Sequence, residues 1–305
     1  MSYAILVPCY NAEQYIDGFL ENLAQQILPF DEVVFFDDAS IDSTYNHLIA
    51  KGCNVIKGDK NRGPGYARNQ LAANCKSQWM HFHDIDDELE PDYLAKTSAI
   101  VKSQTSVDVV LCNVDWHDAA SRQVLLSWTY SNSEINENAV AYTIAHPIGG
   151  INGLYRKSKF VEAGGFSTEI RIWEDADLHV KLAEGKAKFY VIEEVLCRSL
   201  RYNNSASANQ HHGWLTRLDL LTTYAKSFKG RAEQIEIGRQ ANLAASNFIL
   251  LGDASAATRA FRLSESCGVQ VPDNKSTLWH ILKAVLPAGI RIPLRVFQLR
   301  TAFRK

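Results

Sequence analysis

Carboxylates follow two apolar runs of the sequence at the points where the runs end. Asp37 and Asp38 come after the run 32–36, and the acidic segment 84–87 comes after the run 79–82. If both runs are parallel strands, their carboxyl ends share the sheet edge where open α/β proteins bind ligands. Clustered carboxylates repel one another unless a cation is present, and Mg²⁺ or Mn²⁺ that also holds phosphate oxygens suits them. The spacing predicts a cation site for a phosphorylated ligand, although one acidic turn alone is typical of an ordinary turn or helix cap.

A basic loop with two glycines lies between these acidic segments. It spans residues 61–65 (Asn-Arg-Gly-Pro-Gly) and is followed by Ala67, Arg68 and Asn69 at the start of a predicted helix. Glycine permits tight turns and arginine binds phosphate, so the loop favours contact with a phosphate or its sugar, an ordinary surface turn being the alternative. The loop matches neither the Walker pattern nor Gly-x-Gly-x-x-Gly, which disfavours ATPases and nicotinamide-dependent enzymes.

The elements that must position these residues alternate between apolar runs and helix-periodic segments, as is typical of βα units. Strands are predicted at residues 3–7, 32–36, 53–56, 79–82 and 107–114. Beyond Trp116 the alternation weakens, and an antiparallel strand at 123–128 predicts that the sheet is mixed. Later strands are predicted at 152–155, 188–192 and 195–202. The predicted fold class is α/β, with a mixed, mainly parallel sheet and flanking helices.

The pattern becomes helical from about Trp214 onward. Leucine, alanine and phenylalanine recur at helical spacing between residues 215 and 263. We therefore predict two domains, an α/β domain over residues 1–212 and an α-helical C-terminal extension over residues 213–305.

The composition is that of an ordinary globular protein. The chain has 305 residues, 46% of them hydrophobic, and a formal net charge of -2, which excludes disordered and collagen-like classes. It has no global basic field, so no nucleic-acid partner is expected. The six cysteines form no Cys-x-x-Cys pair, and the sequence lacks a signal-peptide pattern and an apolar stretch of ~20 residues. We therefore expect a cytoplasmic protein with reduced thiols.

Five parts of the sequence occur in a characteristic order and spacing. They are 6–11 (Leu-Val-Pro-Cys-Tyr-Asn), 34–44 (Val-Phe-Phe-Asp-Asp-Ala-Ser-Ile-Asp-Ser-Thr), 61–63 with 67–69, 84–87, and 164–166 (Gly-Gly-Phe) with 174–178. Together they resemble glycosyltransferase family 2, over roughly residues 2–207. The resemblance implies a GT-A (Rossmann-like) fold, a nucleotide-sugar donor, a divalent cation, Mn²⁺ or Mg²⁺, and inversion at the anomeric carbon.

The resemblance also implies roles for individual residues. The nucleotide-binding positions are Pro8, Tyr10, Asp38, Arg68 and Asp84. Asp86 holds the metal, and Asp175 is the general base that removes the proton of the acceptor hydroxyl. Glu174 and Trp173 lie on the acceptor side, where the tryptophan ring could stack on the sugar. Taken alone, Glu174 and Asp175 are also typical of acidic residues that stabilise a helix N-terminus, and Trp173 is typical of a core residue.

The segment 200–207 departs from the family pattern. Many relatives place a histidine shortly after its arginine, near the metal or diphosphate, whereas this chain has Asn203. His211 or His212 could supply that contact, but an adjacent histidine pair on a polar loop is more typical of a solvent-facing position. The third protein contact of the cation is therefore His211, His212 or none.

The expected function is transfer of a sugar from a nucleotide-sugar donor to a glycan or lipid-linked acceptor in bacterial surface polysaccharide, lipopolysaccharide or glycolipid synthesis. A sugar-nucleotide pyrophosphorylase is a second candidate, but it would be expected to have a Gly-rich basic loop where this chain has residues 8–11. A third candidate is a catalytically inactive nucleotide-sugar-binding scaffold, which the retention of Asp86 and Asp175 disfavours.

The C-terminal segment 276–305 is basic and amphipathic. It contains lysine and arginine among many apolar residues and has no Asp or Glu. Basic residues near an anionic leaflet and apolar residues in the interface both favour peripheral membrane attachment. We expect contact with the inner face of the cytoplasmic membrane, the alternative being that the apolar face packs on the catalytic domain.

Overall fold

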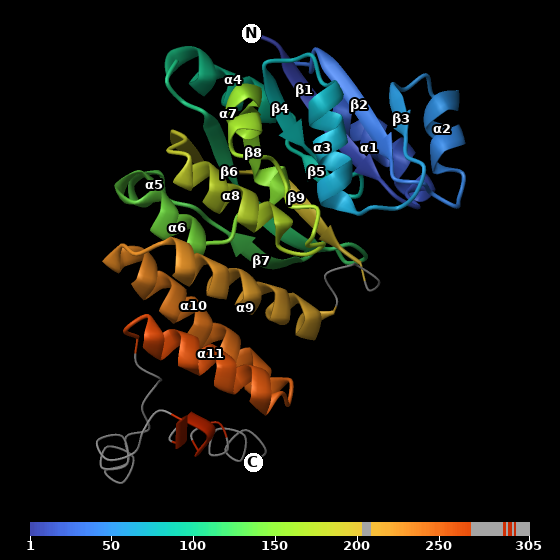
Figure 1. The fold of residues 1–305 in the computed structure, drawn as a ribbon. Helices are drawn as coiled ribbons and strands as arrows, with labels where there is room; N and C mark the ends of the chain where they lie inside the picture. Colours follow the sequence, from blue (N-terminus) through green and yellow to red (C-terminus); the bar gives the residue numbers. More distant parts are fainter. Residues whose placement is uncertain (203–208, 270–288, 291, 295, 297–305) are drawn as a thin grey trace. The chain divides into compact units, whose positions relative to one another are not determined.

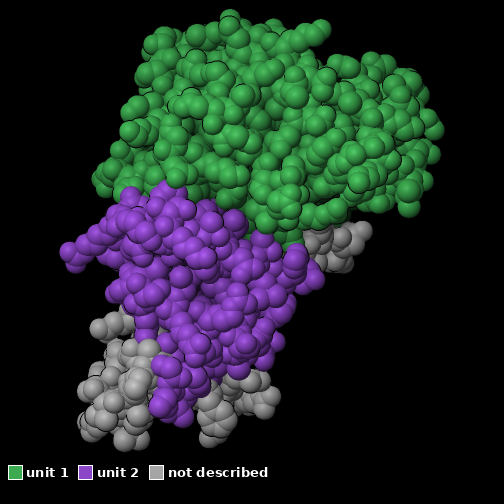
Figure 2. Space-filling model, viewed as in Figure 1, with its two compact units in different colours: residues 1–205 green, residues 206–305 purple. Residues whose placement is uncertain are grey.

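The computed structural model describes residues 1–202, 209–269, 289, 290, 292–294 and 296. The chain divides into two compact units, Met1–Ser205 and Ala206–Lys305, shown in green and purple in Figure 2. Unit 1 carries all five sequence segments that could take part in chemistry, and unit 2 is helical.

A mixed sheet forms the centre of unit 1 (Figure 1). Its strands in the described residues are β1 (Tyr3–Cys9), β2 (Glu32–Asp37), β3 (Val55–Lys57), β4 (Trp79–Phe82), β5 (Glu88–Leu89), β6 (Val109–Asp118), β7 (Val124–Trp128), β8 (Gly153–Arg156) and β9 (Phe189–Arg201). Their order is β3-β2-β1-β4-β8-β6-β9-β5, with β7 paired to β6. The block β3-β2-β1-β4 is parallel, whereas β8 lies antiparallel to both of its neighbours, β4 and β6.

Helices cover both faces of this sheet. They are η1 (Glu13–Tyr15), α1 (Ile16–Ala24), α2 (Thr44–Ala50), α3 (Pro64–Asn74), α4 (Tyr93–Ser103), α5 (Asn132–Glu137), α6 (Ala139–Ala145), η2 (Gly150–Asn152), α7 (Lys157–Glu162) and α8 (Glu174–Glu184). Ile5 of β1 packs in the same core as residues of α1, α2 and α4, whereas its neighbours Ala4 and Leu6 pack with residues of α3, α7 and α8. Because successive side chains of a strand point to opposite faces, a strand buried on both sides is apolar throughout.

The predicted mixed sheet with flanking helices is confirmed, and one strand prediction is wrong. Residues 188–192 and 195–202 were expected to form two strands, but β9 is continuous. In its parallel pairing with β6, Cys112 is opposite Ile192 and Asn113 is opposite Val195. Two exposed glutamates between these partners are accommodated as a bulge, so their polarity interrupts the sequence pattern without ending the strand.

Unit 2 contains α9 (Gln210–Ser227), α10 (Arg231–Leu250) and α11 (Ala254–Ser266). Their shared core also includes Ile292 and Val296, which are both buried. Most of the predicted amphipathic segment 276–305 lies outside the described residues. Among the residues that are described, none of the helices combines the length and the apolar character that crossing a membrane requires.

Candidate active site

The carboxyl ends of β1 and β2 lie side by side and hold the basic loop against them. Cys9 is paired with Asp37 in the ladder, and the backbone N–H of Asp38 donates to the Cys9 carbonyl at 2.8 Å. The Asp38 carboxylate accepts from the backbone N–H groups of Arg62, at 3.0 and 3.1 Å, and of Gly63, at 2.7 Å. The basic loop therefore lies against the carboxyl end of β2.

Two further nucleotide-binding predictions lie at the end of β1. Pro8 is opposite Phe36 in the ladder with β2 and is half-buried. Tyr10 follows the strand, and 48% of its surface is exposed. Asn11 adopts φ 51°, and its backbone N–H donates to the hydroxyl of Ser40. The exposed Tyr10 ring is thus carried by a backbone that the turn after β2 holds in place.

The acidic segment after β4 has three carboxylates in different settings. Asp84 Oδ1 forms a 2.6 Å ion pair with Nη2 of Arg68. Burial, with the charge of Asp84 added, raises the pKa of Asp86 to about 6. Asp87 is buried and accepts from the backbone N–H of Leu200 at 2.8 Å, so it joins this segment to the end of β9. In this segment Asp84 is therefore ion-paired, Asp86 is partly buried, and Asp87 fixes the segment to β9.

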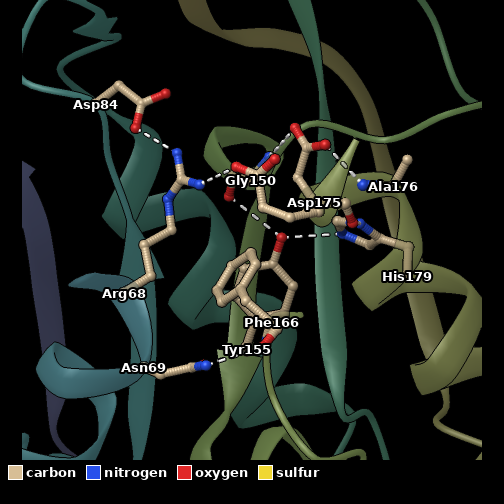
Figure 3. A network of polar contacts seen from close by, with 10 residues as sticks. Arg68, Asn69, Asp84, Gly150, Tyr155, Phe166, Asp175, Ala176 and His179 are labelled. Carbon is tan, nitrogen blue, oxygen red and sulfur yellow. Dashed lines mark hydrogen bonds and ion pairs between the residues drawn. The ribbon is translucent and has the colours of Figure 1, made fainter. Parts of the chain in front are cut away.

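Arg68 connects the acidic segment after β4 to α8 (Figure 3). The residue is on α3, only 5% of its surface is exposed, and its Nη1 pairs with Glu174 Oε1 at 2.7 Å. Burial acts to lower the pKa of Arg68, but the carboxylates of Asp84 and Glu174 outweigh it and keep the guanidinium charged. A buried cation between two carboxylates is strongly destabilised by removal of a partner, so this bridge holds two distant segments together.

Asp175 lies beside this bridge at the N-terminus of α8. Its Oδ1 accepts from the backbone N–H of Ala176 at 2.7 Å, and its Oδ2 accepts from the N–H of Gly150 at 3.3 Å (Figure 3). Burial raises the pKa of Asp175, and burial together with Asp175 raises that of Glu174 to about 7. Asp175 as a whole residue is only partly buried.

Trp173 immediately precedes these acids and has φ 72°, a left-handed conformation that is rare for a bulky residue. Such strain is typical of functional sites. The stacking role of Trp173 stays a prediction.

The Gly-Gly-Phe segment is held against α3 by Asn69. The Asn69 side chain donates to the Phe166 carbonyl at 2.9 Å and accepts from its N–H at 3.0 Å. Gly165 has φ +68°, and a Cβ there would lie 2.6 Å from the Asn69 oxygen. Glycine is therefore required for this docking, which brings the segment before α8 close to Arg68.

The histidine pair suggested as a metal contact belongs to unit 2. His211 and His212 lie in α9, not in the loop predicted for them. His211 Nε2 is 3.0 Å from Asp253 Oδ2, within the same unit. Within the described part of the chain, no three His, Cys, Asp or Glu residues gather into a metal-binding cluster.

Sequence reasoning missed several residues around Asp175, namely Gly150, Tyr155 and His179. Two local signals were available. Gly149 and Gly150 are adjacent glycines, and His179 lies one helical turn after Asp175.

The mixed sheet with flanking helices and a ligand edge at the ends of β1, β2 and β4 defines a GT-A fold. Staphylococcus aureus TarS, residues 1–349 in complex with UDP-GlcNAc, superposes with a TM-score of 0.70 at 20% identity, over 100% of this chain and 92% of that one. The mannosyltransferase PcManGT from Pyrobaculum calidifontis, in complex with GDP-Man and Mn²⁺, superposes with a TM-score of 0.59 at 19% identity. The superposition covers 94% of this chain and 77% of that one.

The chain belongs to glycosyl transferase family 2, whose family model matches residues 4–162. An uncharacterized glycosyltransferase of Haemophilus influenzae is 28% identical over 190 residues, 59% of this chain and 62% of that protein. TarS of S. aureus, a poly(ribitol-phosphate) beta-N-acetylglucosaminyltransferase, is 32% identical over 119 residues, 36% and 20% of the two chains. The minor teichoic acid biosynthesis protein GgaA of Bacillus subtilis is 24% identical over 205 residues, which are 63% of this chain and 45% of that protein. The matches span less than two thirds of each of these relatives.

Proposed function

We propose that this chain is an inverting glycosyltransferase that moves a sugar from a nucleotide-sugar donor to a glycan or lipid-linked acceptor in bacterial surface polysaccharide synthesis. The observation that carries the proposal is the buried bridge from Asp84 through Arg68 to Glu174. This bridge joins the segments that would bind the donor to the helix that presents Asp175. A single-displacement reaction needs such an arrangement, because the base must be near the sugar carbon while the diphosphate is held elsewhere.

In the proposed step, Asp175 accepts the proton of the acceptor hydroxyl as its oxygen forms a bond to the anomeric carbon. The bond from that carbon to the diphosphate oxygen breaks, and its electron pair leaves with the nucleoside diphosphate. The raised pKa of Asp175 supports proton acceptance, since burial makes Asp175 a stronger base than an exposed aspartate. One displacement inverts the anomeric configuration.

The acidic segment after β4 fits a divalent cation. Its oxygens are the ligands that Mg²⁺ and Mn²⁺ prefer, and the raised pKa of Asp86 marks a carboxylate whose charge a nearby cation would stabilise. Asp86, with Asp84 beside it, would hold the cation, and the nucleotide phosphates and water would supply other ligands. When bound, the cation offsets the charge that develops on the departing diphosphate.

The donor and acceptor classes are supported by the relatives. TarS structures contain UDP and UDP-GlcNAc, and PcManGT contains GDP-Man. The names of TarS and GgaA refer to polymers of the bacterial surface. We therefore take UDP-GlcNAc and GDP-mannose as the first donors to test. Pro8, Tyr10 and Asp38 are the proposed contacts of the base and ribose.

The experiment that tests the proposal changes Asp175→Asn and measures nucleoside diphosphate release from both donors with Mn²⁺. Loss of the base should lower the rate by about a hundredfold to ten-thousandfold, while affinity for the nucleotide persists. Asp177→Asn is the matched control, because Asp177 also lies in the first turn of α8 and its loss removes the same helix-terminal charge. Equal rates for Asp175→Asn and the parent would exclude Asp175 as the base.

A further inference from the structure

The Asp175 carboxylate is held from outside its own helix by a glycine backbone. Gly150 donates its N–H to Asp175 Oδ2 at 3.3 Å from the short helix η2, which precedes β8. The contact is long for a hydrogen bond to a carboxylate, so small displacements of η2 would break it. What fixes the backbone of Asp175 relative to Gly150 therefore determines whether this hydrogen bond forms.

Two buried side chains complete a ring of close polar contacts around this hydrogen bond (Figure 3). The Tyr155 hydroxyl, on β8, lies 3.2 Å from the Gly150 carbonyl and 2.9 Å from Nε2 of His179. Nδ1 of His179 lies 2.7 Å from the backbone carbonyl of Asp175. The ring runs from Asp175 through Gly150, Tyr155 and His179 back to Asp175, and both side chains are fully buried.

The chemistry of the partners assigns the protons in this ring. A carbonyl oxygen only accepts, so Nδ1 of His179 must carry the proton that it donates to Asp175. In the neutral imidazole Nε2 is then an acceptor, which the Tyr155 hydroxyl can satisfy. Burial lowers the pKa of His179 to about 4, which is consistent with a neutral ring at physiological pH. The hydroxyl has a single proton, and when this proton is donated to Nε2 the 3.2 Å contact with the Gly150 carbonyl is not a hydrogen bond. Tyr155 is thus hydrogen-bonded to His179, and His179 is hydrogen-bonded to the backbone of α8.

We propose that Tyr155 and His179 are positioning residues that, through the backbone of α8, set the orientation of the Asp175 carboxylate toward the Gly150 N–H. The consequence for catalysis rests on the proposed role of Asp175 as the base. Close packing supports the proposal, because a Cβ added at Gly149 would lie 2.8 Å from Asn152 Oδ1 and 3.8 Å from Asp175 Oδ2. The glycine pair lets the η2 backbone reach the acid, and the hydrogen bonds from Tyr155 through His179 keep the backbone of α8 in place.

The alternative is that the ring only satisfies buried polar groups, as any core must. Tyr155→Phe separates these readings because it removes one oxygen and keeps the aromatic ring. Tyr142→Phe is the matched control, since the buried Tyr142 hydroxyl accepts from the Ser131 N–H at 2.7 Å, outside the ring around Asp175. A similar loss of stability is expected from both variants.

The deciding measurement is the titration of the Asp175 side chain in full-length protein labelled with ¹³C at aspartate carboxyls. The Asp175 signal is assigned by its absence in Asp175→Asn. If the Gly150 N–H loses its alignment in Tyr155→Phe, the carboxylate loses a stabilising donor, and its titration midpoint should rise by about half a pH unit. The charged groups that act on Asp175 are Arg68, Glu174 and Asp84, and Tyr155→Phe changes none of them.

A second variant keeps the test decisive if Tyr155→Phe folds poorly. His179→Gln retains a polar side chain but loses the two ring nitrogens that contact Asp175 and Tyr155, and it should raise the Asp175 midpoint in the same direction. Both variants should lower kcat for nucleoside diphosphate release by about tenfold, with unchanged KM for the donor, as expected of a slightly misplaced base.

The outcomes separate the two proposals. If the Asp175 midpoint of Tyr155→Phe or of folded His179→Gln equals that of Tyr142→Phe, the positioning role is overturned, whatever the rates are. Full activity of Asp175→Asn would instead overturn the base assignment, and the ¹³C titration would still decide the positioning of the carboxylate. The inference is supported if the Asp175 midpoint rises in Tyr155→Phe or His179→Gln while the Asp175 midpoint of Tyr142→Phe equals that of the parent.

Discussion

Arg68 is the residue at which the two sides of the proposed active site meet. Its sequence context suggested contact with a nucleotide, but in the structure its guanidinium pairs with Asp84 and Glu174. Removal of one partner from such a buried group costs about 3 to 5 kcal/mol, so Arg68 also contributes to the stability of the fold. Activity lost in an Arg68 variant would therefore need a separate measurement of folding before it is assigned to nucleotide binding.

Glu174 leads to a prediction about pH and stability. Its pKa of about 7 in the folded chain is above the ordinary value of 4.5, so the folded state binds a proton that the unfolded state releases. The free energy of unfolding should therefore decrease as the pH rises from about 4.5 to about 7. Glu174→Gln does not titrate, so the stability of the parent relative to this variant should fall by about 1 to 3 kcal/mol over that interval.

Urea unfolding of both proteins at pH 5, 6, 7 and 8 measures this difference. Asp87, a buried acid whose pKa does not depend on Glu174, titrates in both proteins, so its contribution cancels in the comparison. A constant difference across the series would show that Glu174 has an ordinary pKa.

Asp86 leads to a prediction about the cation. Asp86→Ala should weaken the Mn²⁺-dependent part of UDP binding at least several-fold, because the cation loses a protein oxygen while the phosphates remain its ligands. Calorimetry with Mn²⁺ and with EDTA measures this part directly. Asp115→Asn, on the β6–β7 hairpin, is a control that removes an acid outside the site. The same metal-dependent affinity in Asp86→Ala and the parent would leave Asp86 without a role in binding the cation.

At the scale of elements, the N-terminus of α3 connects the basic loop to the proposed nucleotide-binding edge. Gly63 precedes this helix with φ 91° and ψ 171°, a conformation that other residues seldom adopt. Its N–H donates to Asp38 Oδ2, so the strained turn and the proposed ribose contact depend on the same residue. Pro64 at the first helical position then starts α3 with a suitable φ.

We therefore predict that Gly63→Ala lowers both stability and nucleotide affinity. The strained backbone should cost about 1 to 3 kcal/mol. Gly18→Ala is the matched control, because Gly18 lies in α1 with no atom within 4 Å of an added Cβ, and alanine favours a helix by about 1 kcal/mol. Thermal unfolding with and without UDP measures both effects. Parental stability and affinity in Gly63→Ala would contradict the structure of this turn.

At the scale of the whole molecule, unit 2 contains segment 276–305, for which the sequence predicts contact with a membrane. Ile292 and Val296 are buried in the helical core of unit 2, so these two apolar side chains are not available to a lipid surface. Six basic residues of segment 276–305 remain a source of attraction to an anionic leaflet, worth on the order of 1 kcal/mol each when close to it. They are Lys283, Arg291, Arg295, Arg300, Arg304 and Lys305.

Flotation with liposomes tests this attraction. The intact chain should float with anionic vesicles at low salt and stay behind with neutral vesicles or at high salt, because the attraction is electrostatic. A chain ending at Asn274 should lose flotation. A full-length variant with these six residues changed to glutamine should lose it too, although all apolar residues are kept. An intact chain that stays in solution with anionic vesicles would show that the segment has no membrane role.

The sequence by itself determined the βα alternation and the acidic segments after β2 and β4. Both depend on local chemistry: strands buried on two faces are apolar throughout, and turns at strand ends select Asp, Asn, Ser and Gly. The resemblance of five segments was sufficient for the family and the fold, which the family match and the TarS structures confirm. It did not predict that Arg68 contacts Glu174.

Only the tertiary structure decided how the segment before and at the start of α8, proposed to face the acceptor, meets the segments proposed to bind the donor. Arg68 and Glu174 are 106 residues apart, and Asp175 and Gly150 are 25 apart. These contacts exist because β8 inserts antiparallel between β4 and β6 and because Asn69 docks the Gly-Gly-Phe segment on α3. The ring formed by Tyr155 and His179 likewise joins a strand to a helix. Pairings of this kind depend on strand order and register, for which a single sequence carries no local signal.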